Sequence, residues 1–185
     1  MTKYLFVKIY QSPRIKRKRR NSSSGINAVP PEDLIDECRR NEILRSFQSA
    51  LEVFREEDET TMTEKLLPIS YTKKPLKELK LVGLKTIDIK NYFDDDSLES
   101  LDADMFLRFA AEKSIQLEKS NMAFQLIDEA KKGVVVLEDL QRVCLDLGET
   151  MTEDELTEMI DFVDSSGEGF LNPKHFFRLA HKTNL

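Results

Sequence analysis

The chain repeats one pattern of residues at an interval of 36 positions, and this repeat constrains its fold more than any other feature. In the first copy Asp128 is followed by Gly133 and then by Val135. The second copy has the same spacing at Asp164, Gly169 and Leu171. Apolar residues at helical spacing flank both copies, so each is predicted to be a loop between two helices.

An EF-hand calcium loop has this layout for physical reasons. An acid at the first position ligates the ion, a glycine at the sixth allows a sharp turn, and an apolar residue at the eighth pairs its backbone with the neighbouring loop. A looser copy begins at Asp94, and a further one near 55–66 or a few residues later fits only if the register is allowed to drift. We therefore predict an all-α fold of four EF-hands in two lobes joined by a helical linker, with the first hand and the region 55–83 left open.

Helical periodicity and breaker residues divide the rest of the chain. Helices are predicted over about 31–55, 84–93, 105–127, 137–147, 152–163 and 173–182. The organisation that follows is a basic, disordered arm (1–29), an N-terminal lobe of degenerate hands (30–110) and a C-terminal EF-hand lobe (111–185).

The segment 123–185 resembles the C-terminal half of the centrin (caltractin) family, with calmodulin a more distant match. Both families share the stretch LGETMTEDELTEMID, whereas RVCLDLGE, the ending FFRLAHKT and the basic, serine-bearing arm are more like centrin. The resemblance implies four EF-hands in two lobes and a protein that grips amphipathic helices of partners at centrosomes, basal bodies, cilia or the nuclear pore. The chain departs from the family in its longer arm and in the spacing of its first hand.

The ligand positions argue against calcium in the third loop. An EF-hand loop needs oxygens at positions 1, 3, 5, 7 and 9 and a bidentate carboxylate at position 12. The loop from Asp128 has Lys132 at position 5 and Asp139 at position 12. We expect Lys132 to pair with Asp128 and so to replace the charge of the ion.

The second and fourth loops also lack ligands. The second keeps Asp94, Asp96 and Asp102 but has no oxygen ligand at positions 5 and 12. The last loop has the best set, at Asp164, Ser166, Glu168 and Asn172. Its position 12 is His175, which offers one neutral nitrogen where calcium prefers two charged oxygens. We therefore expect no cofactor apart from low-affinity calcium at this last loop.

Apolar residues of the last two hands are predicted to form a core and a groove for a partner helix. The candidate groove residues are Phe124, Val143, Leu147, Met151, Met159, Ile160 and Phe176. The predicted function is a non-catalytic, centrin-like protein that binds amphipathic helices of cytoskeletal partners with little or no dependence on calcium. Two alternatives stay open, a calmodulin-type calcium sensor with one weak site and a light chain of a myosin or dynein motor.

Charge is split between a basic arm and an acidic body. Residues 1–20 hold eight Lys and Arg and no acid, so residues 21–185 carry −14 within a net charge of −6. The run RIKRKRR at 14–20 is predicted to contact tubulin or another acidic surface, or to act as a nuclear import signal. Ser22 follows a pair of arginines and is a candidate phosphorylation site, where phosphate would remove charge from the arm.

Composition excludes several other classes of protein. No apolar run approaches the roughly 18–20 residues of a membrane span. The two isolated cysteines, Cys38 and Cys144, favour a reducing compartment. Nucleotide-binding and catalytic motifs are absent. We therefore expect no enzyme and no nucleic-acid ligand, and a cytoplasmic, cytoskeletal location at a centrosome or cilium, with the nucleus as the second choice.

Overall fold

The structure is a computed structural model that describes residues 29–57, 65–164 and 167–182. The predicted arm and Ser22 lie outside these residues. The chain divides into two compact units, Asn27–Ile115 and a second unit that begins at Gln116, and we describe each by itself. None of the helices within the described ranges combines the length and apolarity that a bilayer span requires.

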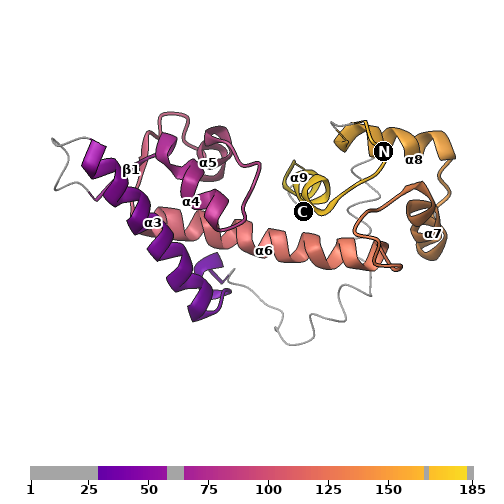
Figure 1. Ribbon diagram of the computed structural model, residues 1–185, viewed down its shortest axis with the longest axis horizontal. Helices are drawn as coiled ribbons and strands as arrows, with labels where there is room; N and C mark the ends of the chain where they lie inside the picture. The colour runs from indigo at the N-terminus through magenta and orange to yellow at the C-terminus, as the bar shows by residue number, and fades with distance from the viewer. Residues whose placement is uncertain (1–28, 58–64, 165–166, 183–185) are drawn as a thin grey trace. The chain divides into compact units, whose positions relative to one another are not determined.

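In the unit Asn27–Ile115, helices gather around the first half of one long helix, α6 (Figure 1). Its elements are η1 (Pro31–Asp33), α3 (Glu37–Glu57), β1 (Leu67–Pro68), η3 (Ile69–Thr72), α4 (Lys73–Glu78), α5 (Thr86–Phe93), β2 (Ser100–Leu101) and the start of α6 (Ala103–Ile127). Buried aromatic residues from α3 and α6 meet in its core, where the rings of Phe47 and Phe106 lie 5.4 Å apart.

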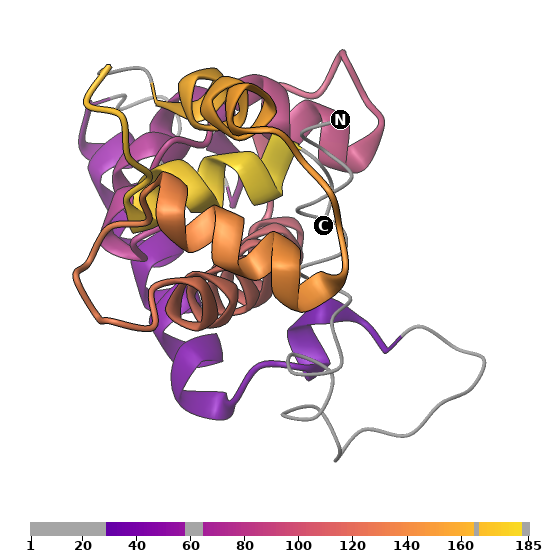
Figure 2. The ribbon, with the colours of Figure 1, turned by 90° about the vertical axis from the view of Figure 1, so that its right-hand side faces the viewer.

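The second unit holds the end of α6 and three further helices, which face the viewer in Figure 2. They are α7 (Leu137–Leu147), α8 (Glu153–Val163) and α9 (Pro173–Lys182). These bounds confirm the predicted helices of this half within one or two residues. The helix predicted to begin at residue 31 begins later, because η1 comes first and Asp36 caps α3 by accepting a hydrogen bond from the backbone N of Arg39 at 2.7 Å.

Short antiparallel pairings join the loops within each unit. Leu67 pairs with Leu101 in one unit, and Val135 pairs with Leu171 in the other. Leu101 is the eighth residue of the frame from Asp94, so the second loop has the predicted register. If Leu67 is likewise the eighth residue of its frame, that frame starts at residue 60 of the sequence, five residues later than the frame at 55–66. The region left open therefore contains a paired strand followed by the short helix α4.

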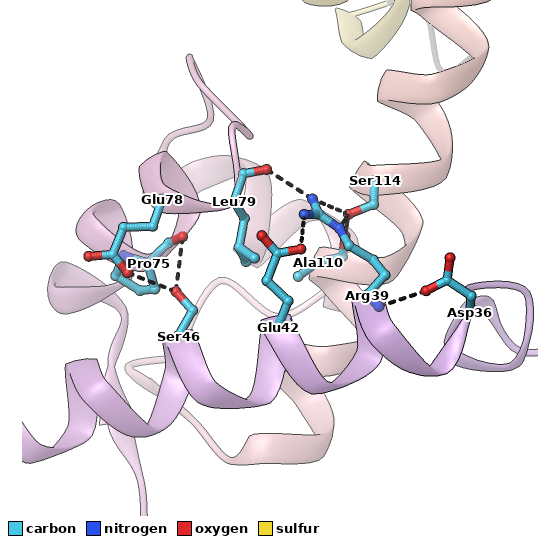
Figure 3. Close-up of polar contacts among 9 residues, drawn as sticks. All are labelled: Asp36, Arg39, Glu42, Ser46, Pro75, Glu78, Leu79, Ala110 and Ser114. Atoms are coloured by element: carbon cyan, nitrogen blue, oxygen red, sulfur yellow. Dashed lines mark hydrogen bonds and ion pairs between the residues drawn. The ribbon is translucent and has the colours of Figure 1, made fainter.

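A network around Arg39 holds α3 to the rest of its unit (Figure 3). The guanidinium donates hydrogen bonds to Ser114 Oγ on α6 at 3.0 and 3.2 Å and to the carbonyl of Leu79, after α4, at 2.9 Å. It also pairs with Glu42 at 2.7 Å. The guanidinium of Arg39 is planar and holds several N–H donors in fixed directions, which suits a contact with three different groups. These contacts connect α3 to α6 and to the end of α4.

Replacing Arg39 by Lys is expected to lower the free energy of unfolding by about 1 kcal/mol. The ammonium keeps the charge, but it cannot reach Ser114 and the Leu79 carbonyl with the geometry of the guanidinium, and a typical hydrogen bond contributes about this amount. Urea denaturation followed by circular dichroism measures the difference. Arg45→Lys, on an exposed position of the same helix, is the matched control and should leave stability unchanged.

Candidate functional site

The third loop closes on its own polar groups. Asp128, only 4% exposed, accepts hydrogen bonds from the backbone N of Lys132 to Oδ1 at 2.8 Å and from that of Gly133 to Oδ2 at 2.7 Å. Gly133 has φ +79°, a conformation that few other residues adopt without strain. Both carboxylate oxygens that would face an ion therefore already have backbone donors.

The ammonium of Lys132 pairs with Asp139, at the far end of the loop. Lys132 Nζ lies 2.7 Å from Asp139 Oδ2, an oxygen that also accepts the backbone N of Val136 at 3.0 Å. Our prediction that this ammonium pairs with Asp128 was wrong. Asp128 is satisfied by backbone N–H groups, and the flexible lysine side chain reaches the position-12 carboxylate instead. The ammonium thus links the loop to the first turn of α7, the connection that a bound ion makes in a calcium-loaded hand.

The last loop repeats the arrangement of the acid at its start. Asp164, 6% exposed, accepts the backbone N of Gly167 at 3.2 Å and that of Gly169 at 2.8 Å. Asn172 caps α9, because its Oδ1 accepts from the backbone N of Lys174 and of His175, each at 3.0 Å. Ser166 lies outside the described residues, and Glu168 is exposed.

His175 occupies the position-12 site of the last loop as a buried side chain. It is 8% exposed, its Nε2 lies 3.5 Å from Asn172 Nδ2, and its Nδ1 has no hydrogen-bond partner. An imidazole in this place offers nitrogen only, whereas the bidentate carboxylate of a calcium loop offers two oxygens to the cation. The last loop thus lacks the position-12 carboxylate, and its oxygen-bearing side chains at ligand positions are those of Asp164, Ser166, Glu168 and Asn172.

The second loop uses its acids for local structure. Asp102 Oδ1 accepts the backbone N of Met105 at 2.8 Å and so caps α6. Asp94 ends α5 in the left-handed conformation, with φ 52°, and the carbonyl of Asp96 accepts a hydrogen bond from Lys90 Nζ. Within the described ranges, no three acidic, His or Cys side chains come together as a metal site would require.

The capping roles of Asp102 and Asn172 were missed by reading the sequence for ion ligands alone. Each lies three residues before the last position of its loop, and each is followed at once by a helix. An Asp or Asn in that place is also the usual N-cap signal. In these two loops the side chain at position 9 therefore caps the exiting helix.

The predicted groove residues lie in one apolar cluster of the second unit. Phe124, Val143, Met159, Ile160 and Phe176 are at most 9% exposed, and the rings of Phe124 and Phe176 are 5.9 Å apart. The other two, Leu147 and Met151, are partly buried and pack against this cluster. In this structure most of the predicted groove residues therefore belong to the core of the unit, and Leu147 and Met151 pack against it from partly buried positions.

Two further titratable side chains, those of Cys144 and Lys113, are buried. Cys144 belongs to the same cluster, and burial, with a smaller contribution from Glu149, raises the pKa of its thiol. Lys113 lies over the rings of Tyr92 and Phe109, at 5.9 and 5.7 Å from their centroids, and desolvation lowers the pKa of its ammonium. A neutral thiol in a core is a poor nucleophile.

Comparisons with known proteins bear on the fold and the family. No protein-family model matches the chain. Caltractin of Naegleria gruberi is 46% identical over 63 residues, which are 34% of this chain and 37% of that protein. Cell division control protein 31 of Saccharomyces cerevisiae is 31% identical over 97 residues, 51% of this chain and 60% of that protein. Centrin-1 of Bos taurus is 49% identical over 47 residues, 25% of this chain and 27% of that protein.

The chain is a divergent EF-hand protein similar to centrin and calmodulin. These relatives, together with helices whose connecting loops pair at position 8, confirm the predicted all-α EF-hand fold. The matched segments span between about a quarter and three fifths of the relatives' lengths. A chain of the Chaetomium theromophilum TREX2 CID domain complex aligns at a TM-score of 0.36 and 20% identity over 84% of this chain and 95% of that chain, a score too low to bear on function. This centrin-like protein thus keeps the scaffold of the hands while its loops have lost ion ligands.

Proposed function

We propose that this centrin-like protein is a non-catalytic subunit that holds an amphipathic helix of a larger, cytoskeletal partner with little or no dependence on calcium. The observation that carries the proposal is the 2.7 Å contact between Lys132 Nζ and Asp139 Oδ2. The lysine ammonium is a cation that belongs to the chain itself, and this contact joins the loop to the first turn of α7. A hand of this kind needs no calcium signal to keep its loop closed.

The cluster of the second unit supports the helix-binding part of the proposal. It contains Met159 and the paired rings of Phe124 and Phe176, and methionine with phenylalanine makes a surface that adapts to a partner's side chains. Leu147 and Met151 lie at its edge on either side of Gly148, whose φ of +69° ends α7. An amphipathic helix with apolar residues at i, i+3, i+4 and i+7 could replace the internal contacts at this edge.

The calcium part of the proposal is tested by titrating a fluorescently labelled basic amphipathic helix onto the full chain in excess calcium and in excess chelator. The expected dissociation constants agree within about threefold, since coupling of a true sensor would change them by roughly 5–150-fold. A hundredfold gain with calcium would instead support the calmodulin-type sensor.

The location of the groove is tested with Met151→Asp, which is expected to weaken helix binding at least about tenfold, because it places a carboxylate in the apolar entrance. Thr150→Asp adds the same charge at the neighbouring exposed position and should change the affinity by less than about threefold. Equal losses in both variants would show that charge alone matters and that the groove lies elsewhere. Thermal unfolding of both variants verifies that they remain folded.

The cellular setting is part of the same proposal. Names of the relatives, among them caltractin, centrin-1 and a cell division control protein, support a centrosomal or ciliary partner over other cytoskeletal ones. A motor light chain would bind its helix in the same manner. Proximity labelling from the full chain in cells distinguishes the two, since centrosomal or basal-body proteins are expected among the labelled neighbours and a myosin or dynein heavy chain would contradict this assignment.

A further inference from the structure

Helix α4 carries three lysines on the side that faces away from the core of its unit. Pro75 and Leu76 are buried, whereas Lys73, Lys74 and Lys77 are exposed. Residues three or four positions apart lie on the same face of a helix, so Lys77 is the neighbour of both other lysines, with Cβ atoms about 5–6 Å apart. These three side chains, called here the α4 lysine face, therefore form one continuous positive surface.

The charge of this face is not neutralised by the residues that the structure describes. None of the three lysines forms an ion pair with a described acid. The one acid of α4, Glu78, accepts a hydrogen bond from Ser46 Oγ at 3.1 Å and so points toward α3 (Figure 3). Lys80 follows the helix, is exposed, and donates its backbone N–H to the Lys77 carbonyl at 3.0 Å. The face is therefore available to an anionic partner.

The lysines do not stabilise the helix that carries them. Lys73 and Lys77 are four positions apart, and like charges at this spacing repel each other. Other groups hold α4 in place, since Ser46 also donates a hydrogen bond to the Pro75 carbonyl at 3.3 Å and Leu76 is only 3% exposed. The packing of α4 thus accounts for its position without the lysines, which leaves their shared face for a role in binding.

The charges of the whole unit indicate what kind of anion this face fits. By sequence, the unit Asn27–Ile115 has 13 bases and 20 acids, a net charge of −7, but residues 73–90 hold six lysines and two acids, or +4. Subtracting +4 from −7 leaves −11 for the remainder of the unit. A broad anionic surface such as a membrane would meet these acids as well as the lysines, whereas a narrow acidic chain could lie along α4 alone.

The residue types of the face also argue against a nucleic acid. Its bases are lysines, which act as flexible point charges, and not arginines, whose planar fork matches phosphate. None of the exposed residues of α4 is aromatic, so the helix offers no ring on which a base could stack. Carboxylates on a flexible chain need neither feature, because each can pair with an ammonium separately.

We propose that the α4 lysine face binds an acidic peptide segment of a partner protein, with Asp or Glu side chains paired to Lys73, Lys74 and Lys77. Such exposed pairs are individually weak and are screened by salt. The contact therefore adds to a second contact rather than holding a partner alone. It lies in the unit Asn27–Ile115 and does not use the apolar cluster of the other unit, so it is independent of the helix binding proposed above.

The proposal is tested by titrating an oligoglutamate peptide onto the full chain in ¹H–¹⁵N spectra. The basic run RIKRKRR is neutralised first, because it would bind the same peptide. The background substitutions are Arg17→Gln, Lys18→Gln, Arg19→Gln and Arg20→Gln. Backbone amides of residues 73–80 are expected to shift until they saturate, and sodium chloride should weaken the binding because it screens exposed charges. Amides of residues 73–80 that do not move would overturn the proposal.

Matched removals of charge measure the contribution of the face. In the same background, Lys73→Gln with Lys74→Gln and Lys77→Gln is expected to weaken peptide binding at least about tenfold, because three exposed ion pairs are lost together. The control removes three exposed charges of the same unit outside α4 and is expected to weaken binding by less than about threefold. Its substitutions are Arg45→Gln, Lys65→Gln and Lys85→Gln. Equal losses in the two variants would show that net charge alone attracts the peptide, which contradicts the proposal.

Urea denaturation separates a role in binding from a role in the fold. The midpoint of the variant with three substitutions in α4 is expected to equal or exceed that of its background, since a repulsion between like charges is removed. A lower midpoint would show that the lysines serve the fold and would contradict their assignment to binding.

Other anions separate the possible occupants. Vesicles that contain phosphatidylserine and a single-stranded oligothymidine are added to the same variants. If substituting the α4 lysine face weakens binding to either of them more than binding to the peptide, the face belongs to a membrane or a nucleic acid instead. Amides of residues 73–80 that shift on dilution without any peptide would assign the face to a second copy of the chain. Because binding of an amphipathic helix is not measured here, its failure would leave these results unaffected.

Discussion

Replacing Leu171 by Ala is expected to destabilise the unit that begins at Gln116 by about 2–5 kcal/mol, the range for large-to-small substitutions in a core. Leu171 is fully buried, lies in the apolar cluster and pairs with Val135 through two backbone hydrogen bonds of 2.8 Å. Alanine keeps those backbone bonds, so the loss reports the side chain alone. Urea denaturation in excess chelator measures the change in the free energy of unfolding.

Leu145→Ala is the matched control, because it removes the same atoms from a side chain that is 79% exposed. It is expected to change the free energy of unfolding by less than about 0.5 kcal/mol. A small effect of Leu171→Ala in chelator that becomes large in calcium would contradict the account. It would show that the pairing of the two loops forms only when an ion is present.

Replacing Lys132 by Met is expected to lower the free energy of unfolding by about 1–2 kcal/mol. Hydrogen bonds to charged groups contribute roughly 1.5–3 kcal/mol. The expected loss lies around or below the lower end of this range, because the lysine side chain is 37% exposed and water partly screens its charge. The change leaves the 12%-exposed carboxylate of Asp139 without its cation. Methionine retains most of the length of the side chain, so packing is largely preserved.

Lys131→Met serves as the control in the same loop. Lys131 is exposed, and it contacts Asp128 through its backbone N, which donates to the Asp128 carbonyl at 3.1 Å. It is expected to change stability by less than about 0.5 kcal/mol. Equal losses in the two variants would show that general loop charge, rather than the contact with Asp139, stabilises the hand.

The fold of the second unit could be predicted because several local signals agree. Gly133 and Gly169 mark the turns, Val135 and Leu171 mark the pairing, and Thr152 with Glu155 forms a capping box at the start of α8. Hydrogen bonds from Thr152 also lower the pKa of Glu155, which keeps that carboxylate charged at the positive end of the helix. Each of these signals depends on residues close together in the sequence.

The first unit was harder because its loops no longer carry such signals. The register of the first hand became visible only through the pairing of Leu67 with Leu101, residues far apart in the sequence. The Arg39 network likewise joins α3 to Ser114, 75 positions away. No periodicity indicates which carbonyl or hydroxyl an arginine will meet.

The candidate site was partly predictable from the sequence. Positions that lack ligands can be counted, and this identified Lys132, Asp139 and His175 as departures from an ion-binding loop. Counting positions could not predict the partner of Lys132, because a lysine at position 5 could reach either end of the loop. In the structure, backbone N–H groups donate to both carboxylate oxygens of Asp128, and the ammonium of Lys132 pairs with Asp139 instead.

The most direct test of the central claim, that the third hand is closed by its own lysine rather than by calcium, follows two glycine amides of the full chain during a calcium titration. Gly133 donates to Asp128 at 2.7 Å and Gly169 to Asp164 at 2.8 Å, so each amide reports one loop in a ¹H–¹⁵N spectrum. The Gly133 signal is expected to stay in place up to about 1 mM calcium, well above the roughly 10⁻⁷–10⁻⁵ M range of sensors. A Gly133 shift that saturates at micromolar calcium would contradict the claim.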